Sequence, residues 1–199
     1  MSSKNLVDEG ITNERKNSKS AIELFLERGL ENVSTRDLTK HLGLSPSHIY
    51  HYFKDWRTLN LDAVTRFLNN ELDEFRSQIE SLSPEDKLKA FVDGIITDKP
   101  DPARKLYSSL WLLSAHDETY NHLMQTYLAK WQQLLAEIIR SGVNKGVFRS
   151  GNAERTARQL DAMLSGYSEY LSNTVSETAI KIARDDVEEF LRTNIFLDK

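Results

Sequence analysis

Apolar side chains recur every three or four residues along almost the whole 199-residue chain, and this spacing restricts the fold more than any single motif does. Val64, Leu68, Leu72, Phe75 and Ile79, for example, follow one another at intervals of four, four, three and four. Such spacing places one apolar stripe along an α-helix, whereas a half-buried strand would need alternation at every second residue. No stretch shows that alternation between hairpin turns. We therefore predict an all-α fold of about nine helices.

Glycine, serine and proline mark where several of these helices begin and end. Gly29 and Gly43 follow apolar helical stretches, as expected of glycine just past a helix C-terminus. At Ser45-Pro46 and Ser83-Pro84, the serine side chain can accept a hydrogen bond from an unpaired amide, while proline has no N–H to leave unsatisfied. The first pair predicts a short third helix, and the second predicts the start of a fifth helix.

The composition excludes several classes of protein. With no cysteine, the chain has no disulfide, no thiolate metal site and no cysteine nucleophile. Residues 1–17 lack the apolar core of a secretory signal. The longest purely apolar run, at 110–113, is far shorter than the roughly 20 residues that cross a bilayer. We expect a cytoplasmic protein with no membrane contact.

Charge is distributed unevenly along the chain. Residues 1–60 contain nine Lys and Arg against eight Asp and Glu, whereas residues 61–199 contain 17 against 22. His41, His48 and His51 add partial positive charge to the N-terminal part. The sequence thus leaves room for a local DNA-facing surface near the N-terminus, while the acidic remainder is expected to avoid phosphates.

The segment 35–53 has the pattern of a helix-turn-helix. Two short helices joined by a tight turn need apolar residues on both sides of a glycine and an apolar anchor in the second helix. These requirements are met in order by Leu38, Leu42, Gly43, Leu44 and Ile49, with Phe53 one turn further on. The second helix would then lie across the first, and its exposed face would enter the major groove of DNA. That face is predicted to carry Ser47, His48, Tyr50 and His51.

The N-terminal region resembles the DNA-binding domain of the TetR family. The resemblance rests on Ala21-Ile22, Phe25, Gly29, Gly43 and the run I-Y-H-Y-F at 49–53, and it covers about 45 residues. It implies a helix-turn-helix DNA-binding domain at 1–55 and a ligand-binding and dimerisation domain at 56–199. By this resemblance the chain is a ligand-responsive repressor.

The resemblance also implies which residues bind DNA. Helix starts favour anions, so Thr35 and Arg36 are expected at phosphates. Base edges are assigned to Ser45, Ser47 and His48, and further backbone contacts to Tyr50, His51, Tyr52 and Lys54. The sequence departs from the family pattern at Trp56, where a phosphate-binding lysine is usual. Lys54 or Arg57 is expected to replace that lysine.

Aromatic and histidine side chains on the sixth to eighth helices have two interpretations. They either pack in the core or line a cavity for a small-molecule effector. The candidate ligand residues are Tyr107, Trp111, His116, Tyr127, Trp131 and Tyr167. An aromatic pocket in an acidic domain suits an organic cation. Residues 111–148 also loosely resemble the C-terminal domain of choline-responsive TetR members.

The last two helices carry apolar stripes that include Leu160, Leu164, Val187 and Leu191. They either complete the core or, as the family resemblance implies, pair across a two-fold axis in a homodimer that matches a palindromic operator. No catalytic motif is present, so an enzyme is not expected, and neither is a cofactor. His48 and His51 lack a third ligand, so no metal site is expected. The alternative function is a helical scaffold or adaptor without DNA binding.

Overall fold

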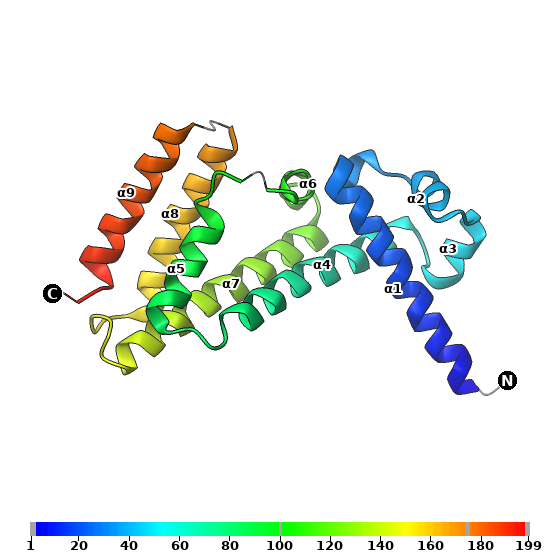
Figure 1. Cartoon of the computed structure of the whole chain (residues 1–199). Coiled ribbons are helices and arrows are strands. Elements are labelled where there is room, and N and C mark those ends of the chain that lie inside the picture. The colour runs from blue at the N-terminus through cyan, green and yellow to red at the C-terminus, as the bar shows by residue number, and fades with distance from the viewer. Residues whose placement is uncertain (1–2, 100, 174–175, 198–199) are drawn as a thin grey trace. The chain divides into compact units, whose positions relative to one another are not determined.

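The computed structural model describes residues 3–99, 101–173 and 176–197, and their fold is all-α, as predicted (Figure 1). Nine α-helices and one 3-10 helix occur in these ranges: α1 (Ser3–Arg28), η1 (Leu30–Asn32), α2 (Thr35–Leu42), α3 (Pro46–Tyr52), α4 (Trp56–Ile79), α5 (Pro84–Ile95), α6 (Arg104–Ser114), α7 (Glu118–Asn144), α8 (Ala153–Asn173) and α9 (Glu177–Asn194). None of the described helices is both long enough and apolar enough to span a bilayer.

The helix boundaries follow the predicted glycine and serine signals. Gly29 and Gly43 have φ values of 85° and 67°, a region that side chains with a Cβ disfavour. A Cβ at Gly29 would also lie 3.0 Å from the Ser109 hydroxyl oxygen. Ser34 caps α2 in a capping box with Asp37, and Ser83 caps α5.

The chain divides into two compact units. Unit 1 comprises Met1–Leu72 with Asp101–Tyr127, and unit 2 comprises Asp73–Pro100 with Leu128–Lys199. Helices α4 and α7 contribute residues to both. The functional boundary near residue 55 remains a prediction, because the packing units group the first three helices with parts of α4, α6 and α7.

The core of unit 1 joins α1 to the helices that follow it. Its buried side chains come from α1, η1, α2, α3, α4, α6 and α7 and include Phe25, Leu38, Ile49, Leu59 and Leu110. Ser109, which is also buried, accepts a hydrogen bond from the Leu30 backbone amide at 3.0 Å and so fixes α6 against the end of α1. This core is the platform on which α2 and α3 are held.

Unit 2 buries the apolar stripes of α8 and α9. Leu160, Leu164 and Val187 are each fully buried within the chain, and Leu191 is 7% exposed. The sequence left open whether these stripes complete the core or form a dimer interface, and the structure places them in the core. The outward sides of the two helices instead present Ser165, Gly166, Tyr170 and Ile182.

Candidate nucleic-acid interface and ligand site

The helix-turn-helix is built on three buried anchors. Leu38 of α2 and Ile49 of α3 are fully buried, and Phe53, which ends α3, is 3% exposed. The left-handed Gly43 closes α2, its amide donating to carbonyls of the last turn, and turns the chain toward α3. The apolar side of α3 is therefore fixed on the core, as the sequence predicts, and its opposite side faces outward.

The outward side of α3 carries the predicted base-reading residues. Ser45, Ser47 and His51 are exposed, Tyr50 is 47% exposed and His48 is half-buried. The Ser45 and Ser47 hydroxyl oxygens lie 2.8 Å apart and hydrogen-bond to each other. Small hydroxyl groups at the start of α3 leave room for the edge of a base to approach.

Residues at the start of α2 lie next to the same surface. The Thr35 hydroxyl is hydrogen-bonded to the Tyr50 hydroxyl at 3.1 Å, which joins the first turn of α2 to the middle of α3. Arg36 is exposed. A hydrogen bond from the Ser34 side chain lowers the pKa of Asp37, so this carboxylate stays ionised within the capping box. Two helices thus contribute polar groups to one surface.

An aromatic layer supports this surface from the C-terminal end of α3. Tyr52 is half-buried, and its ring makes edge contacts with the rings of His48 and His51, with centroids 5.2 and 5.0 Å apart. Both histidines are therefore oriented by Tyr52. The structure places Tyr52 as a support for its neighbours as well as a candidate contact to the DNA backbone.

Trp56 occupies the position where a phosphate-binding lysine is usual, and the structure gives it a packing role. Its ring packs edge-on against Phe25 with centroids 6.2 Å apart. Its indole nitrogen lies 3.2 Å from the side-chain amide of Asn60, one turn further along α4. Asp55 caps α4 by accepting the Thr58 amide at 2.7 Å, a bond that lowers the pKa of Asp55.

Arg57 and Lys54, the two predicted replacements for that lysine, differ in their environment. The guanidinium of Arg57 makes two hydrogen bonds to Asp117, one of them at 2.8 Å, and another to the Thr119 hydroxyl at 3.1 Å. Its hydrogen bond lowers the pKa of Asp117 to about 2. Lys54 is exposed and makes no ion pair with any residue in the described ranges. Lys54 is therefore the better placed of the two to meet a phosphate.

Two of the predicted ligand residues meet in unit 1. The hydroxyl oxygens of Tyr107 (α6) and Tyr127 (α7) lie 2.6 Å apart, and both hydroxyls donate to the Glu71 carboxylate on α4. The two rings stack with centroids 6.1 Å apart, and Phe67 lies beside Tyr107. Burial raises the pKa of Tyr107, so its phenol stays protonated. Three helices thus bring aromatic faces and one carboxylate together.

The other predicted ligand residues do not join this group. Trp111 is 50% exposed and His116 is exposed. Trp131 belongs to unit 2, where it packs against Phe75 and Phe91 with centroids 5.3 and 5.8 Å away. Tyr167, also in unit 2, hydrogen-bonds to Asp186 of α9, a bond that raises the pKa of Tyr167. The core interpretation therefore describes Trp131 well.

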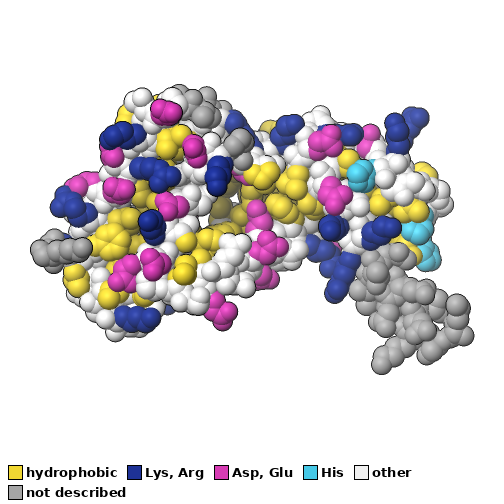
Figure 2. Space-filling model, in the orientation of Figure 1, with side chains coloured by type: hydrophobic (Ala, Val, Ile, Leu, Met, Phe, Trp, Pro, Cys, Tyr) yellow, Lys and Arg dark blue, Asp and Glu magenta, His cyan; other side chains and the backbone are white. Residues whose placement is uncertain are grey.

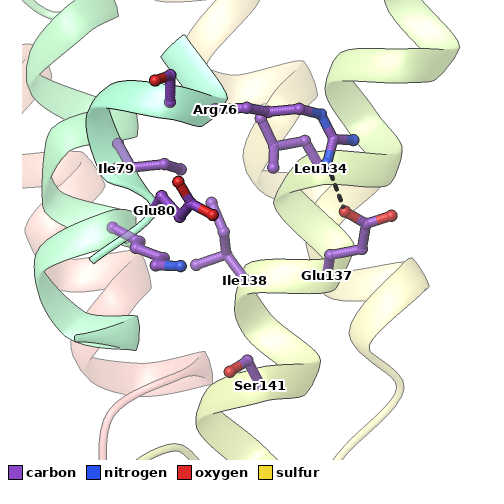
Figure 3. A pocket seen from close by; sticks show the side chains of 9 residues that line it. Arg76, Ile79, Glu80, Leu134, Glu137, Ile138 and Ser141 are labelled. Atoms are coloured by element: carbon purple, nitrogen blue, oxygen red, sulfur yellow. Dashed lines mark hydrogen bonds and ion pairs between the residues drawn. The ribbon is translucent and has the colours of Figure 1, made fainter. Parts of the chain in front are cut away.

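Unit 2 contains a hollow of about 380 Å³ that holds none of the predicted ligand residues (Figure 3). Arg76 extends across it to Glu137, with the joined atoms 3.1 Å apart. Glu80 and Lys87 add one further charge of each sign to its lining. Because the lining charges cancel, the hollow offers no net attraction to an organic cation.

Glu71 and Asp117 are functional candidates that the sequence reasoning missed. Glu71 lies four residues after Phe67, beside the apolar stripe of α4, and a carboxylate in that position is a signal of a polar group held near the core. Asp117 lies directly before α7 and carries no sequence signal of an ion pair with Arg57. Its ion pair joins residues 60 positions apart, which spacing cannot reveal.

Comparisons with known proteins agree with this geometry. The family model for bacterial regulatory proteins of the tetR family matches residues 19–59, and that for the C-terminal region of BetI-type transcriptional repressors matches residues 84–194. The HTH-type transcriptional regulator BetI of Serratia proteamaculans (strain 568) is 29% identical over 147 residues, which cover 70% of this chain and 71% of that protein. The HTH-type transcriptional regulator SAB2452 of Staphylococcus aureus (strain bovine RF122 / ET3-1) is 24% identical over 194 residues, 96% of each chain.

A solved structure shares the fold. A transcriptional regulator from Saccharomonospora viridis, crystallised in complex with choline, matches with a TM-score of 0.80 at 22% identity and covers 94% of this chain and 99% of that one. The helix-turn-helix, its exposed face and a C-terminal family model that spans more than half of the chain agree with one another. The protein therefore belongs to the TetR family of DNA-binding transcriptional regulators, with a C-terminal region of the BetI type.

Proposed function

We propose that this regulator binds a palindromic operator as a homodimer and releases it when an organic cation binds in unit 1. The observation that carries the DNA-binding part is the polar, exposed side of α3 above the buried anchors Leu38, Ile49 and Phe53. Ser45, Ser47 and His48 read base edges. The backbone contacts come from Thr35, Arg36, Tyr50, His51, Tyr52 and Lys54. We assign the chain no catalytic role.

Lys54 takes the place of the family's phosphate-binding lysine in this proposal. Its side chain is exposed, and it follows directly after Phe53 at the end of α3. Arg57 instead holds α4 to the start of α7 through Asp117. Lys54→Gln should therefore weaken DNA binding, whereas Arg57→Gln should act through the ion pair with Asp117.

DNA binding is tested by fluorescence anisotropy with a labelled duplex at increasing salt. Each phosphate contact contributes about 0.9 to the slope of log Kobs against log salt. A regulator that binds as proposed gives a steep negative slope. A slope near zero would contradict DNA binding and would favour the scaffold alternative.

The effector part of the proposal rests on Glu71, Tyr107 and Tyr127. A quaternary ammonium group is attracted to aromatic faces and to a carboxylate, and these three side chains supply both within hydrogen-bonding distance of one another. The Saccharomonospora viridis regulator was crystallised with choline, which makes choline the natural first probe. We propose that such a cation replaces the two hydroxyls as the partner of Glu71.

Within unit 1 this group connects to the DNA-binding surface along α4. Glu71 lies fifteen residues after Trp56, the first residue of α4, a separation of about 22 Å along a helix. A cation that draws Glu71 away from the tyrosines would shift α4 relative to α6 and α7. Release follows if the cation prefers that shifted state, because a ligand moves an equilibrium only by its differential affinity.

The effector proposal is tested by thermal shift with choline and with 3,3-dimethyl-1-butanol, its uncharged analogue of the same shape. A specific ligand at about 100 times its Kd stabilises by about 2.7 kcal/mol. Choline should raise the Tm and the alcohol should not, and Glu71→Gln should abolish the choline effect. Equal shifts from both compounds would contradict a cation site.

The proposed dimer face is the outward side of α8 and α9. The hydrogen bond between Tyr167 of α8 and Asp186 of α9 marks where the two helices adjoin. Tyr170 lies one turn after Tyr167 on α8, and Ile182 lies one turn before Asp186 on α9, so Tyr170 and Ile182 are on adjoining sides of the two helices. Tyr170 is 52% and Ile182 is 53% exposed. Close to them, Gly166 has open space where a side chain would project, which permits close approach of a second helix. Sedimentation of wild type and Ile182→Glu tests this: the wild type should be a dimer and the variant a monomer.

A further inference from the structure

The exposed face of α3 contains few of the positive charges that DNA binding requires. Residues 41–53 include no lysine or arginine. Lys54 and Arg36 lie beside this segment, but Arg57 is committed to Asp117. Since phosphate neutralisation supplies most of non-specific affinity, further cations near α3 are needed for tight binding.

Helix α1 supplies such cations on the side that faces the helix-turn-helix. Glu23 of α1 reaches His41 of α2, with the two side-chain atoms 3.4 Å apart, which identifies that side of α1. Lys19 and Lys16 lie four and seven residues before Glu23, so they share its side one and two turns earlier. Lys16 is therefore about 10 Å along α1 from a contact with α2.

These lysines are not neutralised by their surroundings. Lys16 and Lys19 are exposed, and neither pairs with a carboxylate in the described part of the chain. Exposed Arg15 adjoins them and, with Lys19 and Arg66, lines a groove of about 420 Å³ that has no carboxylate in its lining. Asp62, which lies close by, is already occupied by Arg66 at 2.7 Å and by the Ser18 hydroxyl at 2.6 Å. Lys16 and Lys19 are thus exposed cations without an ion-pair partner among the residues whose side chains the structure describes.

Helix α1 also packs directly against both helices of the DNA-binding motif, α2 and α3. In Figure 2 the histidines of this motif and the Lys and Arg side chains beside α1 appear on one visible side of unit 1. A duplex whose major groove receives α3 has its phosphates on either side of that helix. Lysines on the side of α1 that faces α2 would then lie toward one of these phosphate rows.

We propose that Lys16 and Lys19 on α1 bind DNA phosphates and extend the interface beyond the helix-turn-helix. These contacts are independent of base sequence, so they raise affinity for every duplex equally. They offset the lack of cations in α3. The alternative is that the neighbouring groove binds a small anion instead of DNA, and the experiment below distinguishes the two.

The test is the salt dependence of binding to a random-sequence duplex of about 30 base pairs, with wild type, Lys16→Gln/Lys19→Gln and the control Lys145→Gln. Lys145 is an exposed lysine in unit 2. The double variant loses two phosphate contacts in each protomer and four in the proposed dimer, which should reduce the magnitude of the slope of log Kobs against log salt by about 3.6, while the control keeps the wild-type slope. The melting temperature should be unchanged, because both lysines are exposed.

This inference rests on the proposed DNA binding, and the outcomes distinguish a failure of the inference from a failure of DNA binding. A wild-type slope near zero would contradict DNA binding altogether. A steep wild-type slope that the double variant retains would overturn only the role of the α1 lysines. The last part of the test adds inorganic phosphate to each protein and measures the Tm. If phosphate raises the Tm of the wild type but not of the double variant, and both proteins show the same salt dependence of DNA binding, the groove binds a small anion. The proposal would then be wrong.

Discussion

The helix-turn-helix and the aromatic residues of α6 and α7 were both expected to be functional, yet they differ in how closely the structure follows the expectation. In α2 and α3 the anchors of both helices are buried, the two leucines that flank the turn glycine are half-buried, and the predicted polar side is outward. Among the aromatic candidates, Tyr107 and Tyr127 meet, whereas Trp111 and His116 are exposed. The first region is determined by neighbours within twenty residues and the second by contacts between distant helices.

The largest expected effect in this comparison is the loss of stability when the buried anchor of α3 is shortened. Ile49 is fully buried, so Ile49→Ala leaves a cavity and should lower the free energy of unfolding by about 2–5 kcal/mol. Ser47→Ala, two residues away on the exposed side, should change it by less than about 0.5 kcal/mol. Chemical denaturation measures both. Similar losses for the two variants would mean that α3 has no distinct inner and outer side.

The next effect concerns the aromatic candidates. Tyr107→Leu removes a ring and a hydroxyl next to Glu71 and should weaken choline binding at least about tenfold, since a desolvated cation–π contact contributes about 2 kcal/mol. Trp111→Ala should leave choline binding within about twofold, because Trp111 is half exposed and outside this group. Calorimetric titration distinguishes them. If Trp111→Ala weakened choline binding more than Tyr107→Leu did, the ligand site would lie at Trp111 instead.

A smaller effect is expected at the turn of the helix-turn-helix. Gly43 has a φ of 67° with no heavy atom within 4 Å of an added Cβ, so only backbone conformation opposes a substitution there. Gly43→Ala should cost about 1–2 kcal/mol of unfolding free energy. Gly43→Asn should cost less, because asparagine tolerates the left-handed region. Equal costs would show that the turn relaxes out of this conformation.

The smallest effect is a pH dependence at the start of α7. The hydrogen bond from Arg57 holds the pKa of Asp117 at about 2, below its ordinary value of 3.8. The ion pair therefore stabilises the fold fully above about pH 4, and this contribution is lost as the pH falls toward 2. Asp117→Asn keeps a helix-capping side chain but loses the charge.

The Tm difference between wild type and Asp117→Asn should accordingly be constant at neutral pH and shrink between pH 4 and 2. A screened surface pair contributes little, so the difference should be small throughout. A difference that does not depend on pH would mean that Asp117 acts through its cap of α7 alone.

Local sequence information was sufficient to predict the helices and the exposed surface of the helix-turn-helix. Gly29, Gly43 and Ser83 were predicted as boundaries, and the structure confirms each of them. These signals depend on backbone conformation and on hydrogen bonds within a turn, both of which are set by adjacent residues.

The candidate ligand site and the role of Arg57 could not be predicted, because they depend on contacts between residues that are far apart in the sequence. The meeting of Glu71 with two tyrosines on different helices, and the pairing of Arg57 with Asp117, have no counterpart in local spacing. The stripes of α8 and α9 have the spacing of an apolar face, but spacing does not say whether the chain itself or a partner covers that face.

The most direct test of the central claim places a negative charge on the outward side of α3. Ser47→Glu leaves the buried anchors intact and, through repulsion by phosphates, should reduce duplex binding by about 100-fold or more without lowering the Tm. Ser150→Glu, on an exposed loop of unit 2, should bind as the wild type does. If anisotropy shows that Ser47→Glu binds DNA with wild-type affinity, α3 does not enter the groove and the account is wrong.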